Sequence, residues 1–211
     1  MAIVLEQLAP EPVVVQLETT LPLGCGFGVS GAAALSTALS LGKFFKSKKT
    51  KEELVAVARE ADIQAGTGVG DVPAQVHGGV VYRRAFEGPV DATLMDIPPK
   101  QLFCTVFGPI ETKKVLSDGS VMEKVNRAGE GALTRFNEGK TLHWDELFEI
   151  SWQFSKTSGL VTPEVKRTVE RIQEKGGKGF MIMLGNAVLS TVAVSEKSWQ
   201  TTLDTQGARL L

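Results

Sequence analysis

Apolar and polar residues follow a helical spacing in the first part of this chain. Residues 32–45 are rich in alanine and leucine and predict a largely buried helix. A second helix is indicated by apolar residues at positions i, i+3, i+4 and i+7 of one helix face: Leu54, Val57, Ala58 and Ala61. Gly66 follows this pattern and is expected to end the second helix, because glycine readily takes the left-handed conformation found there.

Short apolar runs predict the strands. The clearest of them lie at residues 13–17, 80–83 and 102–107. Two further runs, residues 180–184 and 187–192, flank the pair Gly185-Asn186. Because a two-residue Gly-Asn link between apolar runs is typical of a β-hairpin, we expect a hairpin here.

Between residue 107 and this hairpin the spacing predicts helices. One apolar face is formed by Leu147, Ile150, Ser151 and Phe154, and another by Val165, Val169 and Ile172. Pro98 and Pro99 stop both helices and strands, so the best domain boundary lies within residues 96–100. We therefore expect an α+β protein with a first domain at residues 1–97 and a second at residues 98–211.

Composition indicates a folded protein and excludes several partners. Of the 211 residues, 43% are hydrophobic and 22% are charged, which is enough apolar material for a core. The net charge of −1 argues against nucleic acid as a partner. No apolar run has the length of a membrane span, and Glu6 and Glu11 do not fit a signal peptide. Cys25 and Cys104 lack metal-ligand spacing, so a reducing cytoplasm is the expected location.

A glycine-rich stretch precedes the first helix. Glycine stands at alternate positions in Gly24, Gly26 and Gly28, and Ser30 and Gly31 follow before the alanines begin. Glycine lets backbone N–H groups approach a ligand closely, and a helix start offers unpaired N–H groups to an anion. The stretch therefore predicts a phosphate-binding loop, although a loop that only lets a helix pack closely is the structural alternative.

Two other glycine motifs fit this stretch poorly. Residues 26–31 match the dinucleotide pattern, but Pro22 interrupts the strand that should lead into it. The acidic residue expected about 20 positions later would fall in residues 49–53, which open a helix. A Walker loop is excluded because no Gly-Lys-Ser/Thr follows.

A second glycine-rich stretch, residues 66–75, reads Gly-Thr-Gly-Val-Gly-Asp-Val-Pro-Ala-Gln. It places one carboxylate, Asp71, on a tight backbone turn. An acidic residue on such a turn is a candidate base facing the phosphate, and an Asx-turn residue that bonds only its own loop is the alternative.

Together the two stretches resemble the GHMP kinases, the superfamily of galactokinase, homoserine kinase and mevalonate kinase. The pattern Pro22-x5-Gly28-x-Ser30-Gly31-Ala32-Ala33 is similar to their phosphate-binding loop. Residues 66–75, followed by residues 78–80 and Arg83, resemble archaeal pantoate kinases, and residues 180–190 resemble the third GHMP motif.

The resemblance implies a GHMP kinase-like α+β fold in two parts. The first would be ribosomal-protein-S5-domain-2-like and would bind ATP; the second would be ferredoxin-like. Family members begin with several dozen more residues, so the resemblance implies a truncated first part that lacks its first strands. Three explanations of this short start are open: the gene start is misassigned, the chain is truncated, or residues 1–21 replace the missing region in a minimal form.

The resemblance also implies roles at the ATP site. The residues expected at the phosphates are Gly24, Gly26, Gly28, Val29, Ser30, Gly31 and Ala32. Ser30 would contact a phosphate or Mg²⁺, and a helix N-cap is its structural alternative. Asp62 is the expected acidic Mg²⁺ ligand, with Glu60 in reserve; ordinary solvated helix charges are the alternative for both.

Asp71 and Arg83 are the expected catalytic residues. By resemblance, Asp71 would face the acceptor hydroxyl and take its proton or hold it in line. Arg83 would bind the carboxylate of pantoate or the transferred phosphoryl group, and a surface strand charge is the alternative.

The implied function is ATP-dependent phosphorylation of the primary hydroxyl of pantoate, giving 4-phosphopantoate for coenzyme A synthesis in archaea. Another small hydroxy acid, mevalonate or homoserine, is the nearest alternative. A non-catalytic binding protein and a dinucleotide-binding oxidoreductase are the others. Unpaired strand edges would favour a homodimer, and neither nucleic acid nor membrane is an expected partner.

Overall fold

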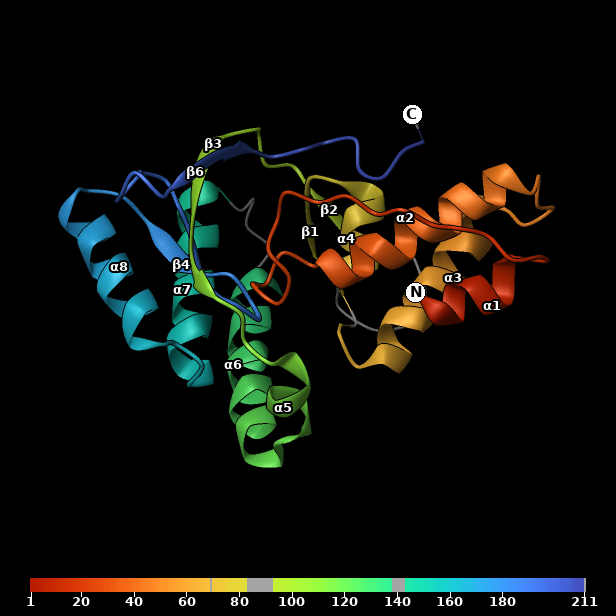
Figure 1. Ribbon diagram of the computed structural model, residues 1–211. Helices are drawn as coiled ribbons and strands as arrows, with labels where there is room; N and C mark the ends of the chain where they lie inside the picture. Colours follow the sequence, from red (N-terminus) through yellow and green to blue (C-terminus); the bar gives the residue numbers. More distant parts are fainter. Residues whose placement is uncertain (69, 83–92, 138–142, 211) are drawn as a thin grey trace. The chain divides into compact units, whose positions relative to one another are not determined.

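The computed structural model describes residues 1–68, 70–82, 93–137 and 143–210 (Figure 1). These residues form two compact units. The first unit comprises Met1–Pro22, Gly28–Met95 and Asp204–Leu211, and the second comprises Leu23–Phe27 and Asp96–Leu203. Both contain helices and antiparallel strands, so the expected mixture of helix and sheet is confirmed.

The first unit is mostly helical. Its elements are α1 (Ala2–Leu8), α2 (Val29–Phe44), α3 (Lys51–Ala65), α4 (Asp71–His77), β1 (Val80–Tyr82) and β2 (Thr93–Met95). The two strands pair antiparallel, with Val81 opposite Leu94. The core lies between α2 and α3, whose small residues allow a close approach: Gly42 of α2 lies directly against the side chain of Leu54.

Local sequence determines both ends of α3. The Thr50 hydroxyl accepts a hydrogen bond from the Glu53 N–H (3.2 Å), and the Glu53 carboxylate accepts one from the Thr50 N–H (2.6 Å). This capping box satisfies two backbone donors at the start of the helix. At the other end Gly66 takes a left-handed conformation with φ 67°, so the predicted end of this helix is confirmed.

The strand expected at residues 13–17 is a wrong prediction. Residues 9–28 belong to no helix or strand. Val13 packs against the core of the first unit, whereas Val14 is 99% exposed. A strand requires a hydrogen-bonded neighbour, and the structure shows no ladder for this segment within the described ranges. Instead, residues 11–18 border a groove of about 670 Å³ beside α2.

Residues 204–210 complete the first unit. The Gly79 N–H donates to the carbonyl oxygen of Asp204 (2.6 Å), and the Ala208 N–H donates to that of Gln75 (2.7 Å). Gly207 is buried and has a φ of 68°. This segment therefore holds the end of α4, although it lies far from α4 in sequence.

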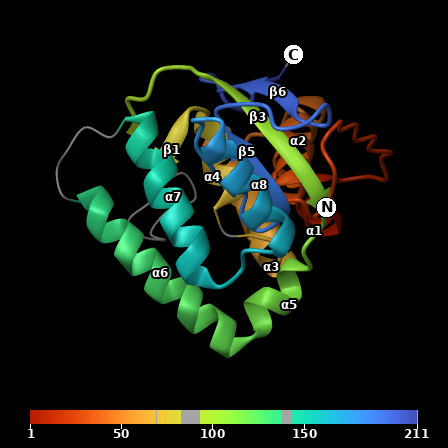
Figure 2. The same cartoon turned by 90° about the vertical axis from the view of Figure 1, so that its left-hand side faces the viewer.

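The second unit contains a four-stranded antiparallel sheet with the order β4-β5-β3-β6. Its strands are β3 (Gln101–Gly108), β4 (Gly179–Met181), β5 (Asn186–Ser190) and β6 (Trp199–Thr202). Its helices are α5 (Thr112–Ser117), α6 (Gly119–Asn137), α7 (Trp144–Ser158) and α8 (Pro163–Glu174). Figure 2 shows α6 and α7 side by side, and α7 and α8 pack against β4.

The predicted face of α8 and the hairpin of this unit are confirmed, whereas the face predicted for α7 is confirmed only in part. In α7 Ile150 is buried, but Leu147, Ser151 and Phe154 are half-buried. Val165, Val169 and Ile172 of α8 are fully buried in the core. Strands β4 and β5 form the hairpin, with Phe180 opposite Leu189. The link, however, is longer than two residues and spans 182–185, because Asn186 already belongs to β5 and Gly185 packs against the backbone of Cys25.

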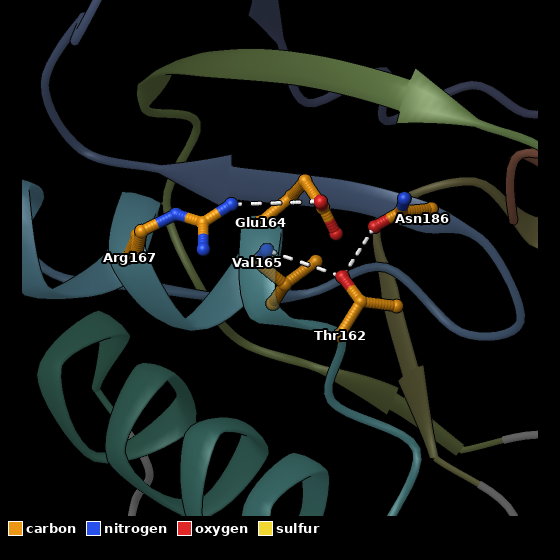
Figure 3. Close-up of polar contacts among 5 residues, drawn as sticks. All are labelled: Thr162, Glu164, Val165, Arg167 and Asn186. Atoms are coloured by element: carbon orange, nitrogen blue, oxygen red, sulfur yellow. Dashed lines mark hydrogen bonds and ion pairs between the residues drawn. The ribbon is translucent and has the colours of Figure 1, made fainter.

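A side-chain cap fixes the start of α8 against this hairpin (Figure 3). The Thr162 hydroxyl accepts a hydrogen bond from the Val165 N–H (3.2 Å) and donates one to Asn186 Oδ1 (2.6 Å). Pro163 occupies the first helical position, where its missing N–H is not needed. Helix α8 is thus tied to the first residue of β5.

Candidate functional site

The start of α2 approaches α4 closely within the first unit. Gly28 is the N-cap of α2 and has a left-handed φ of 63°. A Cβ atom on Gly28 would lie 2.8 Å from Gln75 Nε2 and 3.0 Å from Asp71 Cγ. One on Gly31 would lie 3.0 Å from Asp71 Cβ. The glycines of this stretch therefore make room for Asp71 and its helix.

Ser30 is the second residue of α2 and not its cap, so the N-cap alternative for Ser30 is wrong. Gly28 occupies the cap position, where no side chain can bond the first N–H groups. Ser30 is exposed, and its hydroxyl donates instead to Thr67 Oγ1 (2.9 Å). The early N–H groups of α2 thus have no side-chain partner at the cap, as in an anion-binding helix start.

The end of α3 places Thr67 beside Asp62. The Gly66 N–H bonds the Ile63 carbonyl (2.9 Å), and the Thr67 N–H bonds the Asp62 carbonyl (3.3 Å), which together form a Schellman motif. Apolar side chains often meet at the two positions that Asp62 and Thr67 occupy. Here the contact is polar, because Thr67 Oγ1 donates to Asp62 Oδ1 (2.6 Å).

The carboxylates of Asp62 and Asp71 both lie close to Gly68. The Cβ position of Gly68 lies 2.8 Å from Asp71 Oδ2 and 3.0 Å from Asp62 Oδ2. Asp62 is 3% exposed and Asp71 is half-buried at the first position of α4. Burial, followed by the negative charge of Asp62, raises the pKa of Asp71 from 3.8 to about 6. A carboxyl group with this pKa can exchange a proton near neutral pH.

Gln75 connects Asp71's helix to the glycine loop. Its Nε2 donates to the carbonyl oxygen of Gly28 (2.8 Å), which also accepts the first helical bond of α2 from the Ala32 N–H (3.0 Å). The Gln75 Oε1 atom is buried and has no hydrogen-bond partner among the described residues. A buried, unpartnered oxygen beside Asp71 is costly unless a ligand or water pairs with it.

The structure brings several of the residues predicted at the site together within the first unit. Ser30, Asp62 and Asp71 lie around Thr67 and Gly68, next to the start of α2. Thr67, which sequence reasoning missed, joins two of them. Its signal in the sequence is its place directly after the helix-ending Gly66.

The other predicted residues lie elsewhere. Gly24 and Gly26 belong to the second unit, where the Gly24 carbonyl accepts from the Ile110 N–H (2.9 Å). Glu60 is exposed on α3 and accepts from Gln64 Nε2 (2.7 Å). Arg83 lies outside the described residues. The roles predicted for these residues stay predictions.

The donor set suits a hard cation held by few protein groups. No cluster of three or more His, Cys, Asp or Glu side chains able to hold a metal ion occurs among the described residues. Mg²⁺ keeps several waters and is commonly bound by one or two carboxylates together with substrate phosphates. Asp62 and the hydroxyl of Ser30 fit that requirement. No helix in the described ranges has the length and apolar character of a membrane span.

Comparison with known proteins finds a family match within the first 79 residues. Residues 1–79 match the family model of the GHMP kinases N terminal domain. Two solved structures share the fold. A protein named "Phosphotransferase related to CoA biosynthesis pathway" has a TM-score of 0.77 and 23% identity, over 99% of this chain and 73% of that one. A 4-(cytidine 5'-diphospho)-2C-methyl-D-erythritol kinase has a TM-score of 0.53 and 19% identity, over 91% and 70%.

Three curated relatives are named pantoate kinase. That of Methanospirillum hungatei is 25% identical over 81% of this chain and 56% of the relative. That of Methanocaldococcus jannaschii is 28% identical over 79% and 60%, and that of Thermococcus kodakarensis is 28% identical over 92% and 65%. The chain thus spans less than two thirds of the length of these relatives. The resemblance of the chain to the GHMP kinases is thus confirmed, with residues 1–79 matching the N-terminal domain of that family.

Proposed function

We propose that the chain phosphorylates the primary hydroxyl of pantoate with ATP, giving 4-phosphopantoate for coenzyme A synthesis in archaea. The observation that carries the proposal is the position of Asp71. This carboxyl group has a pKa of about 6 and lies against Gly28 and Gly31 at the start of α2. The names of the three relatives favour pantoate over mevalonate or homoserine, and favour a kinase over a non-catalytic protein.

The proposal includes a finer description of the fold. The first part would be a ribosomal-protein-S5-domain-2-like ATP domain (residues 1–97), and the second a ferredoxin-like domain (residues 98–211). The sheet of the second unit supports the latter. From one edge of the sheet to the other, its strands are the second, third, first and fourth of this unit along the chain. All neighbouring strands are antiparallel, as in a split βαβ arrangement. The sheet departs from that arrangement because the described residues between β5 and β6 form no helix.

In this proposal the start of α2 binds the ATP phosphates. Backbone N–H groups of Gly28, Val29, Ser30, Gly31 and Ala32 would face them, helped by the positive end of the helix dipole. Gly24 and Gly26 are proposed to extend this loop.

Asp62 and Ser30 would hold Mg²⁺, with Glu60 as the reserve ligand. The cation would neutralise phosphate charge that builds up during transfer.

Asp71 is the proposed base. It would take the proton of the pantoate hydroxyl while that oxygen bonds to the γ-phosphorus and the bond to the ADP oxygen breaks. A pKa of about 6 leaves Asp71 largely ionised at neutral pH, yet basic enough to accept a proton. Arg83 is proposed to bind the pantoate carboxylate or the transferred phosphoryl group. We further propose a cytoplasmic homodimer that has neither nucleic acid nor membrane as a partner.

The test is ADP release in a coupled assay with ATP and Mg²⁺, comparing pantoate, mevalonate and homoserine. We expect turnover with pantoate alone, and a fall of about 100-fold or more in Asp71→Asn, because a general base contributes about that much. Asp145→Asn is the matched control: Asp145 is an exposed residue of the second unit that pairs with Lys178 (3.6 Å). No turnover by a folded wild-type protein, or full activity in Asp71→Asn, would contradict the proposal.

A further inference from the structure

Thr67 stands between the two groups to which the proposed function assigns the cation. Its hydroxyl oxygen lies 2.6 Å from Asp62 Oδ1 and 2.9 Å from Ser30 Oγ. Asp62 lies in the last turn of α3, Thr67 directly follows the C-cap Gly66 of that helix, and Ser30 lies in the first turn of α2. The resulting chain of oxygens joins two helices, and the chemistry of its members fixes the direction of its protons.

The direction begins at the carboxylate. The oxygen Asp62 Oδ1 is the acceptor of the 2.6 Å bond, because a carboxylate oxygen accepts hydrogen bonds. Thr67 must therefore donate its single hydroxyl proton to Asp62. Only lone pairs of Thr67 remain for Ser30, so Ser30 donates its own proton to Thr67.

The consequence is seen at the exposed side of Ser30. Once its proton is used by Thr67, Ser30 Oγ offers only lone pairs to a ligand. A phosphate oxygen requires a hydrogen-bond donor, whereas Mg²⁺ requires oxygen lone pairs. The direction of the chain therefore favours a cation as the partner of Ser30, a choice between phosphate and Mg²⁺ that the sequence leaves open.

We infer that Thr67 is a positioning residue that turns the Ser30 oxygen toward a divalent cation and fixes Asp62 beside it. The inference rests on the proposed function, but only on its cation and not on its acceptor. Thr67 acts through Ser30 and Asp62. Its backbone belongs to the Schellman motif that ends α3, which a substitution of the side chain leaves in place.

Binding of Mn²⁺ in the presence of ADP, followed by the electron paramagnetic resonance of free Mn²⁺, tests this inference without turnover. Thr67→Val removes the hydroxyl, and we expect Mn²⁺ affinity to fall by about 10-fold to 100-fold, as for other groups that orient metal ligands. Thr67→Ser keeps the hydroxyl and should bind Mn²⁺ like the wild type. Thr157→Val is the matched control, since the hydroxyl of the exposed Thr157 donates to carbonyl oxygens of its own helix α7.

A double-mutant cycle separates positioning from a general loss of stability. Because Thr67 acts on the cation partly through Ser30, Ser30→Ala combined with Thr67→Val should weaken Mn²⁺ binding by less than the product of the single effects. Thermal unfolding identifies folded samples, and Thr67→Ala replaces the valine variant if that variant does not fold. Wild-type Mn²⁺ affinity in a folded Thr67→Val or Thr67→Ala protein, or strictly multiplicative effects, would overturn the inference.

The outcome is distinguishable from that of the proposed function. If Thr67→Val weakens Mn²⁺ binding but the wild type phosphorylates none of the three acceptors, this inference holds and the kinase proposal fails. If pantoate is phosphorylated and Thr67→Val changes neither Mn²⁺ affinity nor the KM for Mg²⁺, the kinase proposal holds and this inference fails. Absence of Mn²⁺ binding by the wild type with ADP present would also overturn it.

Discussion

The carboxyl group of Asp71 faces that of Asp62 across the Cβ position of Gly68, and this charged neighbour is the second cause, after burial, of its raised pKa. The two groups have different surroundings. Asp62 is buried and its carboxylate accepts a hydrogen bond from the Thr67 hydroxyl. Asp71, by contrast, is only half-buried. Such pairs of carboxyl groups with different environments commonly divide the tasks of a site between them.

The pH dependence of activity should follow Asp71. We expect kcat/KM to rise with pH through an apparent pKa of about 6, because the base works only when ionised. In Asp62→Asn the acid limb of the residual activity should shift to a lower pH, because one of the two causes of the raised Asp71 pKa is removed. Rates measured between pH 4.5 and about pH 8 locate the acid limb of each of the two proteins. An acid limb at the same pH in both proteins would contradict the predicted coupling.

Asp71→Asn should stabilise the protein at high pH. The folded-state pKa of about 6 exceeds the ordinary value of 3.8, so ionisation of Asp71 above pH 6 opposes folding. Urea unfolding at pH 8 should show a gain of about 1–3 kcal/mol, since one pKa unit corresponds to about 1.4 kcal/mol and partial exposure reduces it. The gain should shrink as pH falls through 6 toward 3.8. A gain independent of pH would indicate a cause other than ionisation.

Gly28→Ala should destabilise the first unit. Its φ of 63° is strained for a residue with a side chain, and the new Cβ would lie 2.8 Å from Gln75 Nε2. We expect a loss of about 1–3 kcal/mol in the free energy of unfolding. Gly131→Ala is the matched control, because Gly131 lies in α6 with open space around its Cβ position. That change should stabilise by about 0.5–1 kcal/mol. Equal effects of the two changes would disprove the role given to Gly28.

Removing the hydroxyl of Thr162 should weaken the second unit. Thr162→Ala loses both the cap of α8 and the bond to Asn186, for which we expect a cost of about 1–2 kcal/mol. Thr162→Ser keeps the hydroxyl and should unfold at nearly the wild-type denaturant concentration. The serine variant serves as control, and an alanine variant that unfolds like the wild type would show that this cap adds nothing.

Local chemistry made much of the fold predictable. Gly66 ends α3 because a left-handed residue is needed there, and the faces of α3 and α8 follow from apolar spacing. Predictions failed where partners far away in the sequence decide the outcome. Residues 13–17 have the composition of a strand, but a strand forms only when another strand pairs with it.

The candidate site shows the same division. The glycine stretches and Asp71 stand out in the sequence because few other roles require such residues in that order. Thr67 does not stand out, because its role depends on a hydroxyl 37 positions away. Likewise, the contact of Gln75 with Gly28 joins two helices and has no local signature.

The part played by residues 204–210 bears on how the protein is made. The N-terminus of a chain leaves the ribosome first, and N-terminal domains generally fold first. In this protein Gly79 and Gln75 receive their backbone partners, Asp204 and Ala208, only after the whole second unit has been synthesised. The helix that carries Asp71 therefore lacks these partners until residues 204–208 have left the ribosome, and nascent chains stalled before that point would expose it to proteases and chaperones.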